Sequence, residues 1–243
     1  MRRASIAAVI AAAAISAAPR AARAQVSDNQ TFWILLIDQA EYRRHGGANG
    51  LRWDVQGWVG KDYDKLWIKT EGLQDVASGG IGEGEVQALY SRLISPFWEF
   101  QAGVRYDARW SRAFGPSRAF AVLGFQGIAP YFFDLEPALF ISQDGDLSAR
   151  LTSTYDLLLT QRLILQGRFE VDAALQKVER FGVGSGLNDV ELGARLRYEL
   201  SREFAPYLGI SWVRKVFDTS VLARRAGESD SVFSLVAGLR LWF

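Results

Sequence analysis

The stretch "DSVFSLVAGLRLWF" (230–243) decides which class of fold this chain can adopt. Apolar residues occupy every second position of it, namely Phe233, Leu235, Ala237, Leu239, Leu241 and Phe243. This period of two is typical of a β-strand with one apolar face and one mostly polar face. The sequence ends on this strand, and in a soluble sheet such a terminal strand usually frays or is covered. A closed sheet, in which the last strand pairs with the first, would remove the open edge.

The same alternation recurs along the chain in segments of about ten residues. It is clearest at 98–106, 147–157, 163–173 and 190–198, and noisier at 32–43, 50–60, 62–71, 83–93, 118–128, 131–142 and 205–216. Together with the last segment these predict about twelve strands. Beyond the N-terminus no stretch approaches the ~20 apolar residues of a membrane-spanning helix.

The connections between the predicted strands alternate between long and short. The long ones are 43–50, 72–84, 109–118, 175–188 and 216–230, the short ones are 60–62, 94–96, 128–130, 158–161 and 201–205, and 142–146 is shorter than its class. This alternation predicts an all-β fold, a transmembrane antiparallel up-and-down β-barrel with tight turns in the periplasm and long loops outside the cell.

Aromatic residues gather beside the predicted tight turns, where a girdle at the inner membrane interface is expected. They are Phe32, Trp33, Phe97, Trp98, Tyr131, Phe133, Phe204, Tyr207, Trp242 and Phe243. The alternative is a soluble sandwich or barrel whose apolar face forms its core. In such a core the aromatic residues need not collect next to one class of turn, so the membrane barrel is favoured.

The N-terminus has the features of a cleaved secretory signal peptide over residues 1–24. Arg2 and Arg3 precede an apolar run at 6–18, and Ala22-Arg23-Ala24 fits an A-x-A cleavage site. Residues 25–31 are then a short periplasmic segment, and 32–243 form the barrel.

Because four of the 28 basic residues and none of the 27 acidic ones precede Gln25, the mature charge is about −3. This balance gives no reason to expect nucleic-acid binding, and the absence of cysteine excludes disulfides.

Several long stretches resemble the copper-resistance protein B family of outer-membrane proteins. The clearest are "EVQALYSRLISPFWEFQAGVRYD" (85–107) and "GVGSGLNDVELGARLRYELSREFAPYLGISWVRK" (182–215), with further similarity at 51–72, 126–136, 155–166 and 237–243. The resemblance implies a barrel in the cell outer membrane that acts in copper tolerance, with copper as its ligand and periplasmic copper-handling proteins as partners.

One departure from that family concerns the metal. Its members usually carry a Met- and His-rich segment before the barrel, but here residues 25–33 read "QVSDNQTFW". The whole chain has 1 Met and 1 His. Copper(I) prefers sulfur ligands and copper(II) prefers imidazole, so the resemblance alone does not establish that this chain binds copper.

The charged residues on the polar faces of the predicted strands would face the barrel lumen. They are Glu99, Arg105, Asp107, Arg150, Asp156, Arg162, Arg168, Glu170, Asp189, Glu191, Arg195 and Arg197. They could form a cation path or oxygen-donor metal sites, or they could fill the lumen with salt bridges, because an unpaired buried charge is costly. A barrel of about twelve strands lies between eight-stranded barrels, in which side chains fill the lumen, and sixteen-stranded barrels, in which the lumen is open. We favour a largely plugged lumen.

Three residues are candidates for contact with a metal ion. Asp134 and Glu136 stand out because no Arg or Lys lies between Arg118 and Arg150. His45, expected in the first long loop, could anchor a weak copper(II) site, although its flanking Arg43 and Arg44 favour an ordinary solvated histidine.

Two functional interpretations follow, and neither is enzymatic, because the single histidine has no adjacent serine or aspartate to form a catalytic pair. In the first, the barrel binds, sequesters or passes copper. In the second, it is a small cation-preferring pore or a structural barrel that has lost copper binding. In both, Phe243 with Leu241 and Leu239 is expected to be the signal that the barrel-assembly machinery reads before insertion into outer-membrane lipid.

Overall fold

A computed structural model describes residues 30–46, 48–76, 81–110 and 114–243. The predicted signal peptide and the next five residues, 25–29, lie outside the described part of the chain. No described helix is long and apolar enough to cross a membrane.

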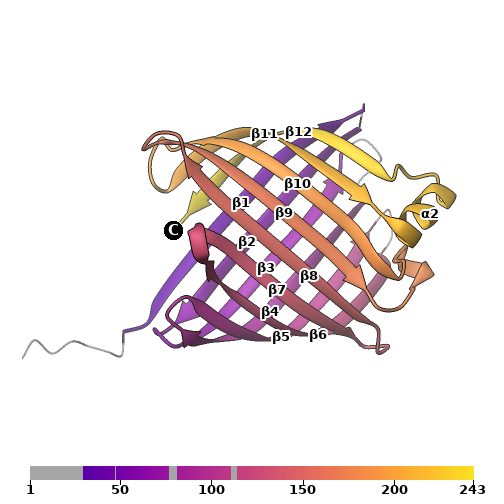
Figure 1. Ribbon diagram of the computed structural model, residues 1–243, viewed down its shortest axis with the longest axis horizontal. Helices are drawn as coiled ribbons and strands as arrows, with labels where there is room; N and C mark the ends of the chain where they lie inside the picture. Colours follow the sequence, from indigo (N-terminus) through magenta and orange to yellow (C-terminus); the bar gives the residue numbers. More distant parts are fainter. Residues whose placement is uncertain (1–29, 47, 77–80, 111–113) are drawn as a thin grey trace, which may run out of the picture. The chain divides into compact units, whose positions relative to one another are not determined.

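Twelve antiparallel strands in the described residues close into one barrel, each paired with its neighbours in the sequence (Figure 1). They are β1 (Phe32–His45), β2 (Ala48–Gly60), β3 (Asp64–Asp75), β4 (Gly82–Ser95), β5 (Trp98–Trp110), β6 (Phe114–Ala129), β7 (Phe133–Ser142), β8 (Leu147–Leu158), β9 (Leu163–Ala174), β10 (Gly186–Tyr198), β11 (Phe204–Lys215) and β12 (Ser231–Trp242). The predicted fold class and strand number are confirmed.

The barrel closes where β12 pairs with β1. The pairing runs from Leu36 opposite Trp242 to Arg44 opposite Leu235. At its end the Phe243 amide donates to the Leu35 carbonyl over 2.9 Å, and the Leu35 amide donates to the Phe243 carbonyl over 3.0 Å. These bonds satisfy the backbone groups that an open edge would leave unpaired in hydrocarbon. The strand that suggested a closed sheet therefore forms the closing seam.

The barrel has its apolar residues outside and its polar residues inside, which is the reverse of a soluble protein. Val104 and Leu235 on the outer face are each 60% exposed, whereas Glu41 and Arg195 inside are 2% and 1% exposed. Such an outer face suits lipid, and the buried polar face suits a filled lumen. The period-2 alternation thus separates the two environments on each strand.

β1 contains one irregularity that affects the lumen. Its register shifts between Ile37 and Gln39 against β2, and between Ile37 and Ala40 against β12. One extra residue in β1 therefore faces its partners, which is the definition of a β-bulge. As a result Asp38 and Gln39 both lie on the inner face, and Asp38 accepts a hydrogen bond from Arg240 Nε over 2.9 Å.

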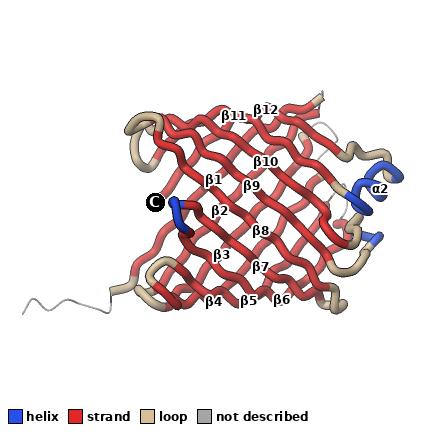
Figure 2. The backbone as a smooth tube through the Cα atoms, in the orientation of Figure 1, coloured by secondary structure: helices blue, strands red, loops and turns tan. Residues whose placement is uncertain are grey.

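The two ends of the barrel differ in their connections (Figure 2). The short-turn end carries the C-terminus and the turns 61–63, 96–97, 130–132, 159–162 and 199–203, with the 3-10 turn η1 (Pro130–Phe132). The loop end carries η2 (Glu179–Phe181) and helix α2 (Phe217–Arg225).

Three predicted long loops are shorter than expected, because strand pairing continues into them. At 72–84 the pairing reaches Gln74 opposite Gly82. At 43–50 the strands pair as far as His45 opposite Ala48, and at 109–118 β5 and β6 extend to Trp110 and Phe114. The loops at 175–185 and 216–230 do remain long between their strands.

Tyr207 of the predicted aromatic girdle faces inward. Tyr207 is buried and donates a hydrogen bond from its hydroxyl to Glu41 over 3.1 Å. Its ring lies against Gly238 on β12, where a Cβ atom would come within 2.6 Å of the ring. Phe32, Trp33, Phe97, Tyr131, Phe133 and Phe243 are exposed as expected.

Candidate functional site

A cluster of ion pairs crosses the lumen, and we call it the charge belt. It comprises Glu41, Arg43, Arg52, Glu71, Glu85, Arg150, Arg168, Glu170, Glu191 and Arg195, which come from β1, β2, β3, β4, β8, β9 and β10. β1 and β10 supply its most buried part. Glu41 accepts from Arg43 Nε over 2.6 Å and from Arg195 Nε over 3.0 Å, and Arg43 also donates to Glu191 over 2.9 Å.

Three arginines extend the belt to the other strands. Arg52 donates to Glu191 over 3.1 Å and reaches Glu71 at 3.5 Å. Arg150 donates to Glu85 over 3.1 Å and also contacts Glu71. Arg168 donates to Glu170 on its own strand over 2.7 Å and to Asp54 on β2 over 3.3 Å. Because each arginine bridges carboxylates on different strands, the belt ties the walls of the barrel together.

An apolar wall lies beside the belt on the inner face. Trp67, Leu89, Phe120, Val122 and Phe140 pack together there. Arg105, which binds Glu85 over 2.6 Å, has its guanidinium 4.5 Å from the centre of the Phe140 ring. The arginine therefore joins the charged and apolar parts of the filled lumen through a cation–π contact.

Between the belt and the short-turn end lies a cavity of about 300 Å³, which we call the vestibule. Its walls include belt residues such as Arg150 and Arg168 and residues near the short-turn end such as Trp58. Seven carboxylates line it: Asp54, Glu71 and Glu85 pair with arginines of the belt, and the other four, Asp38, Asp134, Glu136 and Asp156, we call the vestibule carboxylates. Glutamines and threonines fill much of the remaining polar lining, so the vestibule offers oxygen donors.

The vestibule carboxylates are only lightly paired. Asp38 binds Arg240, Asp156 binds Arg197 over 2.8 Å, and Glu136 binds Lys69 over 2.7 Å. Among the described residues, Asp134 has no ion pair within 4.0 Å and no side-chain hydrogen bond. Asp134 is also exposed. It is therefore free to meet a small cation from the short-turn end.

Most of the predicted lumen charges lie on the inner face of the barrel. Arg105, Arg150, Arg168, Glu170, Glu191, Arg195 and Arg197 are in ion pairs there, with Glu99 paired to Lys65 and Asp107 to Arg105. Asp189, close to the loop end, has no ion pair within 4.0 Å among the described residues. Arg162 is an exception, because β8 ends at Leu158 and Arg162 lies exposed in the turn before β9.

The three metal candidates are not brought together. His45 ends β1 at the loop end, whereas Asp134 and Glu136 begin β7 at the short-turn end. In the part of the chain that the structure describes, no three His, Cys, Asp or Glu residues form a group able to hold a metal ion. Glu136 also has a partner that its sequence neighbourhood did not reveal, because Lys69 reaches it from β3.

Sequence reasoning missed the β1–β3 members of the lumen network: Asp38, Glu41, Arg43, Arg52, Asp54, Lys69 and Glu71. These strands belong to the noisier segments, in which the bulge at Asp38 breaks the alternation. The signal was present in β1, where Gln39, Glu41 and Arg43 alternate with Ala40 and Tyr42.

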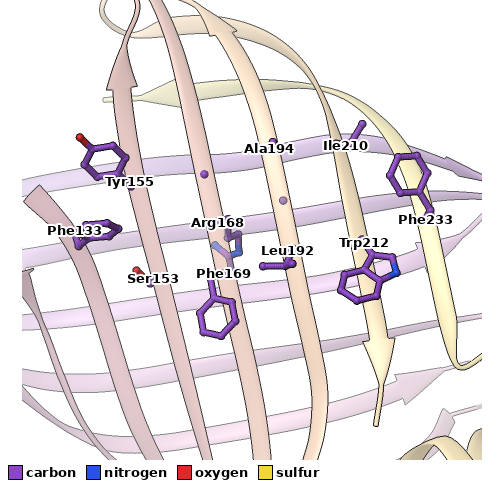
Figure 3. A pocket seen from close by; sticks show the side chains of 12 residues that line it. Phe133, Ser153, Tyr155, Arg168, Phe169, Leu192, Ala194, Ile210, Trp212 and Phe233 are labelled. Carbon is purple, nitrogen blue, oxygen red and sulfur yellow. The ribbon is translucent and has the colours of Figure 1, made fainter.

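A second hollow, of about 430 Å³, lies on the outer face of the barrel (Figure 3). Phe133, Tyr155, Phe169, Trp212 and Phe233 surround it. Gly167 and Ala194 face each other across β9 and β10, and their small size leaves the depression. This hollow faces lipid and is separate from the lumen charges.

The chain is similar to known proteins over its whole barrel. The family described as "Copper resistance protein B precursor" matches residues 31–243. Copper resistance protein B of Escherichia coli is 43% identical over 218 residues, which are 90% of this chain and 72% of that protein. The copper resistance protein B homolog of Pseudomonas syringae pv. tomato (strain ATCC BAA-871 / DC3000) is 39% identical over 219 residues, with the same coverage.

Solved structures with a similar fold are porins. The KdgM porin aligns with a TM-score of 0.53 at 10% identity, over 87% of this chain and 99% of that one. The NanC porin aligns with a TM-score of 0.55 at 12% identity, over 86% and 99%. At these identities the similarity concerns the fold alone.

Proposed function

The chain belongs to the copper resistance protein B family of outer-membrane proteins, and we propose that its barrel acts in copper resistance by capturing copper(II) ions in the vestibule. The observation that carries this proposal is the light pairing of the four vestibule carboxylates, with Asp134 unpaired among the described residues. A copper(II) ion would meet carboxylate, amide and hydroxyl oxygens there. Copper(I), which prefers sulfur, has no suitable ligand in that lining.

The charge belt favours capture over free passage. It lies directly behind the vestibule and occupies the lumen with side chains that hold each other in place. An ion that enters from the short-turn end would therefore stop at the belt. We place that end in the periplasm, where a Met- and His-rich copper-handling protein would supply the soft ligands that this chain lacks.

The first experiment is deletion of the gene in a strain without a second copy. We expect growth to stop at a lower copper concentration, with a smaller effect for other divalent metals. The double variant Asp134→Asn/Glu136→Gln should restore only part of the tolerance that the wild-type gene restores. The matched control is Asp144→Asn/Glu179→Gln, which removes two exposed carboxylates at the loop end and should restore tolerance fully. Unchanged copper tolerance after deletion would end the proposal.

A small cation-preferring pore, or a structural barrel, is the second candidate function. The composition of residues 25–33, which contain no Met and no His, favours it. Conductance in planar bilayers separates the two candidates, since capture in front of a closed belt predicts little current, whereas a pore predicts steady cation current.

A further inference from the structure

Lys69 occupies the vestibule beside the carboxylates that would receive a cation. Its ammonium donates to Glu136 Oε2 over 2.7 Å and to Gln126 Oε1 over 3.0 Å. It also lies 5.3 Å from the centre of the Trp67 ring, which is close enough for a cation–π contact. Lys69 comes from β3 and Glu136 from β7, so the pair crosses the lumen.

The surroundings of this ammonium are held in place by further hydrogen bonds. Gln126 Nε2 donates to Glu136 Oε1 over 3.3 Å, which orients both side chains toward Lys69. Gln101 Nε2 donates to the same Gln126 oxygen over 2.8 Å. The oxygen atoms therefore form a seat for a positive charge, and the Lys69 ammonium fills it.

We propose that Lys69 is a tethered cation that sets the affinity of the vestibule for divalent metal ions. While its ammonium lies on Glu136 and Gln126, an incoming ion meets both an occupied seat and a positive charge. If the ammonium swings away, the Glu136 carboxylate and the Gln126 amide oxygen face the ion. This inference rests on the proposed function, because it names the residue that regulates capture at the same site.

Lys65 provides a matched control on the same strand and the same face. It too pairs with a glutamate, Glu99, and lies 4.7 Å from the centre of a tryptophan ring, that of Trp58. However, Lys65 is not part of the vestibule lining. Replacing it removes the same charge and a similar set of contacts without freeing the seat.

The test is manganese(II) binding to the purified barrel. The spectroscopic signal of the free ion measures how much of the manganese is bound. Manganese prefers oxygen ligands, so His45 at the loop end does not mask the result. Removing one positive charge about 6 Å from a divalent ion removes its repulsion of that ion. Even at the dielectric constant of water, this should raise the affinity for the ion about tenfold. We therefore expect Lys69→Leu to bind manganese at least about tenfold more tightly than wild type, and Lys65→Leu to bind like wild type. Leucine adds no ligand atom.

A third variant identifies the seat. Lys69→Leu/Glu136→Gln should lose the gain, because the carboxylate would then be missing. No gain in Lys69→Leu, an equal gain in Lys65→Leu, or a gain that survives Glu136→Gln would each overturn the proposal. A shift of the barrel on heating before electrophoresis verifies folding, and Lys69→Gln replaces the leucine variant if that variant does not fold. These measurements are independent of copper tolerance in cells, so this inference and the proposed function can fail separately.

Discussion

The two halves of the lumen use the same residue types in different ways. In the charge belt, Glu41 accepts from two arginines and a tyrosine and is 2% exposed. In the vestibule, the side chains of Glu136 and Asp156 are 32% and 39% exposed, and each has one close cationic partner. Burial thus separates carboxylates that hold the barrel together from carboxylates that can meet an ion, although both alternate along strands in the same manner.

The physical reason is the cost of burying charge. A carboxylate that loses its water needs several donors in place of it, so belt residues occur in networks. A carboxylate that keeps contact with water tolerates one partner or none. The comparison predicts that substitutions in the belt affect stability and that substitutions in the vestibule affect ion binding.

The largest effect should come from the seam, because both halves depend on closure. Phe243→Asp places a charge on the outer face beside the bonds between Phe243 and Leu35, and we expect it to prevent assembly altogether. The measurement is the amount of heat-modifiable barrel in the outer membrane. Lys177→Asp, in the exposed loop between β9 and β10, is the control and should assemble normally. A normal barrel with Asp at position 243 would show that the seam does not need this residue.

The second largest effect is expected from a substitution in the belt, which should lower the stability of the barrel. Glu41→Gln leaves the Arg195 guanidinium without its carboxylate, and stranding a buried charge in this way costs about 3–5 kcal/mol. Urea unfolding of the barrel in lipid vesicles measures the loss. The double variant Glu41→Gln/Arg195→Met removes both charges and should lose less stability than the single variant. Equal losses would mean that the pairing of these charges is not what stabilises the belt.

The smallest effect is expected in the vestibule. Asp134→Asn removes no ion pair in the described residues, and the side chain is exposed. Its free energy of unfolding should therefore stay within about 0.5 kcal/mol of wild type in the same urea assay. A loss comparable to that of Glu41→Gln would abolish the distinction between the two halves.

The sequence predicted the barrel well because membrane and lumen impose a simple period. In β10 and β12 every second residue is apolar, and these residues face outward as expected. Strand ends were less predictable, since pairing such as His45 with Ala48 continues into a stretch rich in glycine and charge. Tyr207 illustrates another limit, because its inward position depends on space that Gly238 provides from the neighbouring strand.

The candidate site was predicted only in part. Asp134 and Glu136 were recognised because their own segment lacks basic residues, and both do line the vestibule. The partner of Glu136 could not be inferred, since Lys69 lies 67 positions away and reaches it through the closed lumen. Which carboxylates remain unpaired depends on the circumference of the barrel and on side-chain reach, and a one-dimensional pattern contains neither.

Because of the bulge in β1, Asp38 is one extra residue in the alternation of inward and outward side chains along that strand. Residues 33, 35 and 37 share the outer phase before it, and residues 40, 42 and 44 share it afterwards. Without Asp38, Ile37 and Ala40 would be separated by Gln39 alone, and the alternation would become regular. A single codon could therefore be gained or lost here without turning any other side chain of β1 toward the wrong environment. Among the described residues, Arg240 would lose its ion pair with Asp38, so this position can add one charge to the lumen without changing the lipid-facing surface.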